Sequence, residues 1–185
     1  MPATYAHYKF GKEVLSALPR PLQNSIEAHR ELFDIGLHGP DILFYYNALK
    51  KDPVNEQGHT LHEQFADEFF HHAVEVIEKA KDPAAARAYI YGFICHFALD
   101  SECHPYVEKI MQVGRVSHNE IEMELDRMML TEDYHDPLRY LTAKHIQPKM
   151  EYAEVIAPFF KDVTAEQIYK ALKGMVFYHK LFLAP

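Results

Sequence analysis

The most informative stretch of the chain is AYIYGFICHFALD, residues 88–100, which carries no formal charge before Asp100. A helix that is apolar on nearly every side lies in the interior of a protein. The stretch therefore predicts a buried central helix. His96 and Asp100 lie within this helix, and buried polar groups need partners. These two residues are the first candidates for a functional site.

Helix start signals recur along the rest of the chain. Asp82-Pro83 and Asp136-Pro137 each place a capping residue before a proline at the first helical position. Capping boxes, in which Ser or Thr precedes Glu or Gln by three residues, start at Thr60, Ser117 and Thr164. These signals predict helices over 61–81, 83–104, 117–130, 136–147 and 164–183. We expect further helices over 21–34 and 149–160, short helical pieces over 11–18 and 41–49, and a loop over Lys50–Gly58.

Signals for β-structure are missing from the sequence. No clear alternation of apolar and polar residues indicates a strand, and no Asn-Gly pair indicates a hairpin. The predicted fold is therefore an all-α multi-helix bundle. The 185 residues, 48% of them hydrophobic and 25% charged, have the size and composition of one globular domain. We expect residues 1–185 to form a single domain.

The net charge and the cysteine content limit which partners and which cellular compartment are expected. The net charge of −8 at pH 7 argues against a broad surface for nucleic acid. No stretch of about 20 apolar residues predicts a transmembrane segment, and the first ten residues lack the apolar core of a signal peptide. Cys95 and Cys103 would stand about 12 Å apart on one helix, too far for a disulfide, and free thiols fit a reducing compartment. We expect a cytoplasmic protein, with no prediction of its oligomeric state.

A metal-binding pattern follows from the central helix. His96, Asp100 and His104 are four residues apart and therefore line one helix face. The two histidines lie about 12 Å apart along the axis, so they can hardly share one ion. The next predicted helix offers His118 and Glu122 to complete a second site with His104. Two histidines and a carboxylate, with a position left for water, form a common catalytic zinc shell, and iron or manganese are the alternatives.

Several motifs, taken in chain order, resemble the zinc-dependent phospholipase C family, which has distant fold relatives among fungal zinc nucleases. They are His7, His38-Gly39-Pro40-Asp41, Gly58-His59, His96-x3-Asp100-x3-His104 and His118-x3-Glu122. The resemblance is strongest over residues 1–130. It implies an all-α bundle of the phospholipase C type, with a metal site between helices.

The resemblance also implies roles for these residues. One site would comprise Asp41, His96, Asp100 and either His59 or His62. A second would comprise His104, His118 and Glu122. His7 would belong to a third site that shares Asp100, and Asp41 resembles the aspartate that is the family's proposed general base. The choice between His59 and His62 stays open: His59 is expected in a loop before Thr60, and His62 in a first helical turn.

One departure from the family pattern concerns the third ion. Secreted members supply part of its ligand shell with the amino group and carbonyl of an N-terminal Trp, and this chain has no Trp. It is also shorter than those members and has no lipid-binding β domain. We therefore expect two firmly held zinc ions and a weaker or missing third, unless the amine of Pro2 or a water replaces the Trp.

The function that these patterns predict is metal-dependent hydrolysis of a phosphoric ester, in which a metal-activated water attacks phosphorus. The substrate would be a soluble ester or a phospholipid through its headgroup. The alternative is a structural or regulatory metal-binding protein that keeps the ligands without catalysis. A third reading, an HD-type phosphohydrolase built on His135-Asp136, fails because Asp136 before Pro137 is a helix-cap signal. The remaining histidines, His29, His38, His71, His72, His145 and His179, have no trusted partner at ligand spacing.

Overall fold

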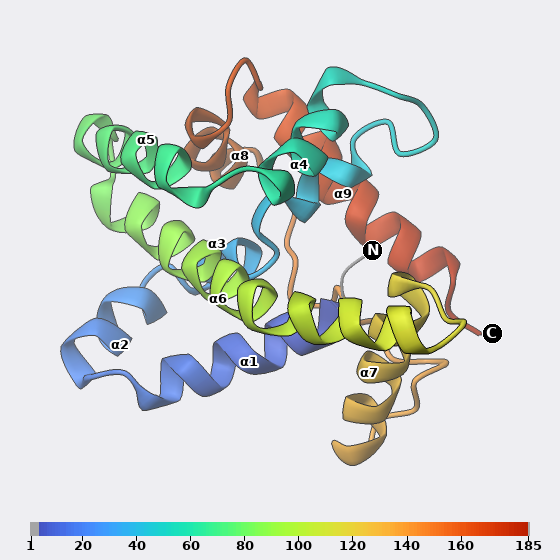
Figure 1. Ribbon diagram of the computed structural model, residues 1–185. Coiled ribbons are helices and arrows are strands. Elements are labelled where there is room, and N and C mark those ends of the chain that lie inside the picture. The colour runs from blue at the N-terminus through green and yellow to red at the C-terminus, as the bar shows by residue number, and fades with distance from the viewer. Residues whose placement is uncertain (1–3, 185) are drawn as a thin grey trace.

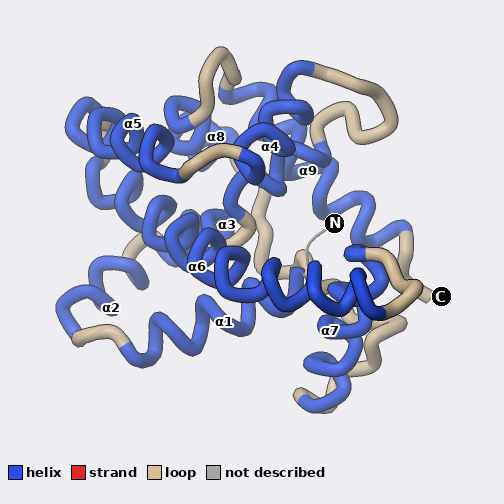
Figure 2. Tube along the Cα trace, in the orientation of Figure 1, coloured by secondary structure: helices blue, strands red, loops and turns tan. Residues whose placement is uncertain are grey.

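The computed structural model describes residues 4–184, which form helices joined by turns and contain no strand (Figures 1 and 2). The all-α prediction is confirmed. The elements in chain order are α1 (Thr4–Ala17), α2 (Arg20–Glu27), α3 (Arg30–Gly36), the 3-10 helix η1 (Gly39–Tyr45), α4 (Pro53–Glu63), α5 (Ala66–Lys79), α6 (Pro83–Val113), α7 (His118–Glu132), α8 (Met150–Ile156), the 3-10 helix η2 (Ala157–Phe159) and α9 (Ala165–Leu181). None of the helices in the described range is long and apolar enough to cross a membrane.

Helix α6 is the centre of the fold. It crosses the middle of the molecule in Figure 1, with α1 and α7 on one side and α4 and α5 on the other. Tyr89 and Phe93 of its apolar stretch are buried, as predicted, but Ile94 and Phe97 are exposed, so the burial of this stretch is incomplete. Helix α3 packs against it so closely that a Cβ added at Gly92 would stand 2.2 Å from the carbonyl oxygen of Phe33. This close crossing brings η1, which follows α3, onto the face of α6 that carries His96.

Helix α6 is longer than predicted. It ends at Val113 rather than near residue 104, and it contains Pro105. Proline removes one backbone hydrogen bond and usually ends a helix, but a helix can continue through it as a kink. Asp82 caps the start of α6 as expected, since its side chain accepts hydrogen bonds from the backbone N–H groups of Ala84 and Ala85. Both cysteines lie on α6 and are free.

The prediction of one helix over 61–81 and a loop over Lys50–Gly58 is wrong. Helix α4 starts at Pro53, and the chain breaks at Gln64 and Phe65 before α5 begins. The capping box belongs to Asp52: its side chain accepts from Val54 N at 3.0 Å, while Asn55 Oδ1 accepts from Asp52 N at 3.1 Å. Thr60 caps nothing, because its hydroxyl donates to the carbonyl of Glu56 within the helix. Asp52 before Pro53 is thus the start signal of α4, in the stretch where a loop was expected.

Other boundaries also differ from the predictions. Residues 136–147 form turns instead of a helix: Asp136 Oδ1 accepts from Leu138 N, but the burial of Ala143 and Ile146 in the core holds the rest in irregular structure. The predicted helix 21–34 is split at His29, whose φ of −132° is not helical. The segments expected over 11–18, 41–49, 149–160 and 164–183 correspond to α1, η1, α8 with η2, and α9. The capping boxes of Ser117 and Thr164 are confirmed.

Two aspartates, one in α7 and one directly after its end, hold α1 in place. The carboxylate of Asp126 accepts from Tyr5 N at 2.9 Å and from Ala6 N at 2.8 Å, which caps the start of α1. Asp133 accepts from the hydroxyl of Tyr5 at 2.6 Å and from Lys9 Nζ at 2.8 Å. Backbone N–H groups at a helix start need such acceptors. These contacts fix the position of α1 along its axis relative to α7, and so place His7 against α6.

The corrected start of α4 gives a first prediction. Replacement of Asp52 by Ala should lower the melting temperature by about 3 °C, because one capping residue is lost in a chain of this size. Replacement of Thr60 by Ala, followed by the same thermal melt, should change it by less than about 1 °C, as for a surface position without a cap. A larger loss at Thr60 than at Asp52 would restore the capping box predicted from the sequence.

Candidate metal centre

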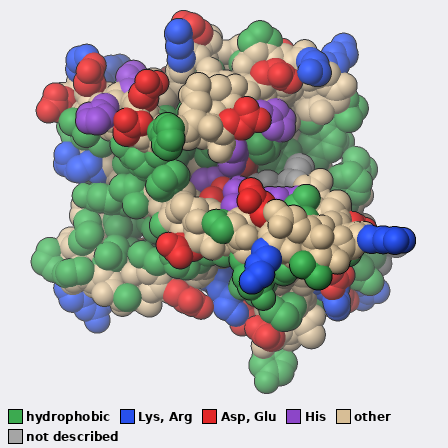
Figure 3. Space-filling view, viewed as in Figure 1, with side chains coloured by type: hydrophobic (Ala, Val, Ile, Leu, Met, Phe, Trp, Pro, Cys, Tyr) green, Lys and Arg blue, Asp and Glu red, His purple; other side chains and the backbone are tan. Residues whose placement is uncertain are grey.

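Acidic and histidine side chains from five elements meet beside α6. Figure 3 shows them gathered in a hollow near the middle of the molecule. Among the described residues, three groups place their ligand atoms within 4.8 Å of one another. The groups are Asp41, His62 and His96; His7, His96 and Asp100; and His104, His118 and Glu122. The first two share His96, so they adjoin each other.

The first group lies between η1, α4 and α6. His62 Nε2 lies 3.0 Å from Asp41 Oδ1. Its other ring nitrogen, Nδ1, is 2.7 Å from the carbonyl oxygen of Gly58 and must donate to it. This hydrogen bond fixes the tautomer and leaves the lone pair of Nε2 free to bind a metal. A Cβ added at Gly39, which has a φ of +48°, would stand 2.3 Å from the ring of His96, so only glycine brings η1 this close.

Asp100 links the groups. Its Oδ2 lies 3.1 Å from His96 Nε2 and 3.7 Å from His62 Nε2. Its Oδ1 lies 3.2 Å from His7 Nε2 and 3.9 Å from His104 Nε2. The two carboxylate oxygens therefore face different histidines. A carboxylate in this position can bridge two ions.

The third group lies between α6 and α7. His118 Nε2 hydrogen-bonds Glu122 Oε1 at 2.7 Å, as residues four apart on one helix can. His104 Nε2 lies 3.9 Å from the same oxygen, and the rings of His104 and His118 meet edge to face with centroids 5.1 Å apart. The axial spacing of His96 and His104 separates this group from the other two, as the sequence analysis predicted.

Unpaired polar atoms show that the residues fit a metal. His96 Nε2 and Asp41 Oδ1 are buried and make no hydrogen bond, although each lies about 3 Å from a polar neighbour. Buried polar atoms without a partner are rare because each costs free energy. Close but unpaired polar atoms are expected where ligand atoms point toward a common metal position instead of toward one another. Imidazole nitrogens with carboxylates suit zinc.

The electrostatics of the metal-free protein favour a cation here. Burial would raise the pKa of Asp100, but His7 and His96 hold it well below its usual range. Burial would lower the pKa of His62, but Asp41 and the carbonyl of Gly58 raise it to about 9. Burial likewise opposes protonation of His96, yet the two carboxylates raise its pKa. A metal ion must displace the proton of His62, so its affinity should fall as the pH falls.

The structure separates His59 from His62. Both lie on α4, so the expectation of a loop at His59 is wrong, and so is that of a first helical turn at His62, which lies in the last turn of the helix. The ring of His59 packs on Phe44, with centroids 4.5 Å apart, and belongs to none of the three groups. The other predicted ligands all do: His7, Asp41, His62, His96, Asp100, His104, His118 and Glu122. The amine of Pro2, expected as a substitute ligand, lies outside the described residues.

Comparison with protein families places the chain. The profile of the family described as zinc dependent phospholipase C matches residues 6–174 of the 185. The chain belongs to the zinc-dependent phospholipase C family. No curated protein and no solved structure gave a match.

The match to the zinc-dependent phospholipase C family includes every candidate ligand from His7 to Glu122. It also extends through α8 into α9, beyond residues 1–130, where the predicted resemblance is strongest. The family name indicates zinc dependence, in agreement with the ligand types. The all-α architecture is thus that of a zinc-dependent phospholipase C family member.

A buried pair of histidines outside the ligand groups could not be predicted from the sequence. His38 Nε2 and His145 Nε2 are 2.6 Å apart, and Tyr8 stacks on His145 with ring centroids 3.9 Å apart. Burial lowers the pKa of His145 to about 3, and burial together with His145 lowers that of His38. One neutral ring therefore donates to the other, which ties the segment between α7 and α8 to the residue before Gly39. The partners are 107 residues apart, so no spacing rule could find them.

The choice between His62 and His59 gives a second prediction. His62→Ala should lower the zinc content of tag-free protein by about one ion per chain, because a shell of three or four ligands loses one. His59→Ala is the matched control on the same helix and should keep the zinc content of the unchanged protein. Elemental analysis after dialysis measures both. Equal zinc loss in the two variants would contradict the placement of His62.

Proposed function

We propose that this chain hydrolyses a phosphoric ester at the three ligand groups around Asp100. The observation that carries the proposal is that four of these ligands line an open cavity of about 270 Å³ instead of a closed structural site. They are His62, His96, Asp100 and His104, and the aromatic side chains of Phe65 and of residues on α5 and α6 line the cavity with them. Structural zinc sites are closed, whereas catalytic sites keep a position for water and substrate.

Zinc, when bound, lowers the pKa of a coordinated water toward 7 and offsets negative charge that develops on the phosphoryl oxygens. The residues of the chain supply the remaining functions. His62, His96, His104 and His118 present ring nitrogens to the metals. Asp100 presents one oxygen to His7 and the other to His96, so its carboxylate would help to hold metal at this end of the cavity.

Asp41 is the proposed general base. Its Oδ1 is buried and forms no well-aligned hydrogen bond, so it can accept a proton from the attacking water. His62, 3.0 Å away, orients the carboxylate. The same atom is a candidate metal ligand, so Asp41 would either bind zinc and orient the water or take its proton.

The cavity walls favour an ester that carries an apolar group. Phe65, Phe69, Phe93 and Phe97 line it together with the ligands. A phospholipid with its headgroup ester at the metals fits this combination of polar and apolar lining. A soluble ester would use the polar lining alone. The net charge of −8 makes a polynucleotide substrate unfavourable.

Turnover of a chromogenic phosphodiester tests the proposal. Protein stripped with a chelator should be inactive, and added zinc should restore turnover. Asp41→Asn should lower kcat by about 100-fold or more at equal zinc loading, because a general base contributes roughly 10²–10⁴-fold. His59→Ala, outside the ligand groups, should keep full activity. Zinc-loaded protein that turns over neither this ester nor short-chain phospholipids would favour a structural or regulatory metal protein instead.

A further inference from the structure

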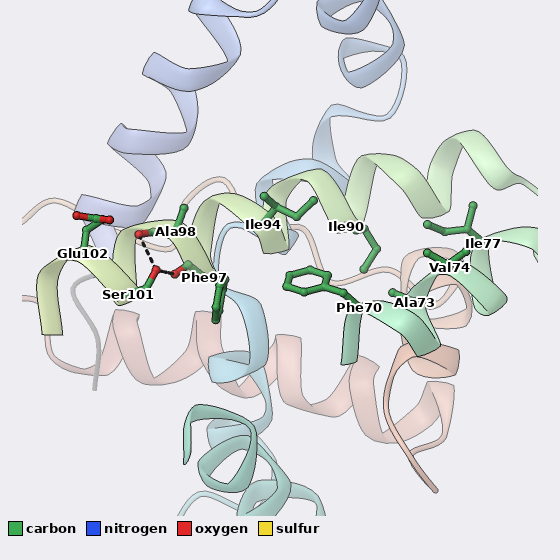
Figure 4. Close-up of a pocket in the computed structure, with 10 residues that line it drawn as sticks. All are labelled: Phe70, Ala73, Val74, Ile77, Ile90, Ile94, Phe97, Ala98, Ser101 and Glu102. Carbon is green, nitrogen blue, oxygen red and sulfur yellow. Dashed lines mark hydrogen bonds between the residues drawn. The ribbon is translucent and has the colours of Figure 1, made fainter. Parts of the chain in front are cut away.

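A second cavity runs along α6 on the side of α5, with a volume of about 540 Å³. Figure 4 shows the residues that line it, with the side chains of Phe70 and Phe97 in the space between the two helices. On α5 they recur between Phe70 and Ile77 at positions three and four apart, and on α6 between Ile90 and Glu102 at similar spacing. Each helix therefore turns an apolar stripe toward this groove, and the two stripes do not close it.

The groove offers almost no polar partner. Its one hydroxyl, that of Ser101, donates to the carbonyl oxygen of Phe97 at 2.7 Å and so is satisfied within α6. Its one formal charge is Glu102, at the C-terminal end of the α6 wall. Val74 and Ile94 on its walls are 56% and 43% exposed. A contiguous apolar surface of this kind marks a binding site for an apolar ligand.

The groove is continuous with the candidate metal centre. Phe97 and Ser101 line both cavities, and they adjoin His96 and Asp100 in the chain. From Ser101 to Ile90 the groove follows eleven residues of α6, or about 16 Å at 1.5 Å per residue. One leaflet of a bilayer has a hydrocarbon depth of about 15 Å, half of the 30 Å core. An acyl chain that starts at the metals thus has the length to fill the groove.

We propose that the groove between α5 and α6 binds one acyl chain of a lipid whose phosphoric ester lies at the metal centre. This inference rests on the proposed function and assigns a subsite to it. A peptide strand would leave its backbone groups without partners here, because the walls have no free donor or acceptor apart from Glu102. An acyl chain has no such groups and needs only apolar contact.

The length of the acyl chain of the lipid provides the test. Each methylene buried in the groove should raise affinity about fourfold. Monomeric diacyl phosphatidylcholines of four to seven carbons per chain, kept below their micelle concentration, should bind the zinc-loaded protein with stepwise increasing affinity in calorimetry. Their kcat/KM should rise in parallel. Ile94→Asp and Val74→Asp, each at an exposed groove position, should abolish the dependence on chain length.

Val113→Asp is the matched control, because Val113 is an exposed apolar residue at the end of the same helix, 86% exposed and outside the groove. It should keep the full dependence. Turnover of the chromogenic ester should be equal in all four proteins, which separates loss of the groove from loss of the active site. Calorimetry reports on the groove even without turnover, so failure of the proposed function is seen separately.

Two outcomes would overturn the acyl-chain site. The first is an affinity that does not change with chain length in the unchanged protein. The second is a dimer in analytical ultracentrifugation that Ile94→Asp dissociates, because the groove would then be covered by another copy of the chain.

Discussion

The carboxylate of Asp100 is the group on which the arrangement of this molecule depends. It stands on the central helix, 14% exposed, with four histidine rings within 3.9 Å of its oxygens. A mostly buried carboxylate costs free energy unless positive charge surrounds it. Helices α1 and α4 each bring one histidine to it, and α6 brings two. The fold can be understood as the packing that holds these rings around one carboxylate.

The packing devices that achieve this lie outside the ligand groups. Asp126 caps the start of α1 and so fixes the position of His7 relative to α6. The close approach at Gly92 presses α3 onto α6, and Gly39 carries η1 over the ring of His96. In the metal-free protein the carboxylates raise the pKa values of His62 and His96, and the unpaired atoms at Asp41 and His96 remain a cost. Such local conflict is typical of functional sites, where stability is given up for binding.

How much of the site the sequence could predict depends on how many residues separate the side chains that meet in it. His96, Asp100 and His104, like His118 and Glu122, are four residues apart, so helical geometry alone predicts their shared faces. His62 could not be chosen over His59, because the start of α4 was assigned to Thr60 and both Asp52 and Thr60 carry capping signals. The helix expected over 136–147 failed because tertiary burial outweighs a local cap. The pair of His38 and His145 depends on folding alone, since no sequence distance links its members.

Anomalous diffraction from zinc-soaked crystals tests the central claim most directly. The account predicts a zinc ion within about 2.0–2.2 Å of His96 Nε2 and a carboxylate oxygen of Asp41 or Asp100, and a second between His104, His118 and Glu122. The group of His7, His96 and Asp100 should show a weaker peak or none. Zinc found at exposed histidines such as His71 and His72, with no peak within reach of Asp100, would contradict the account.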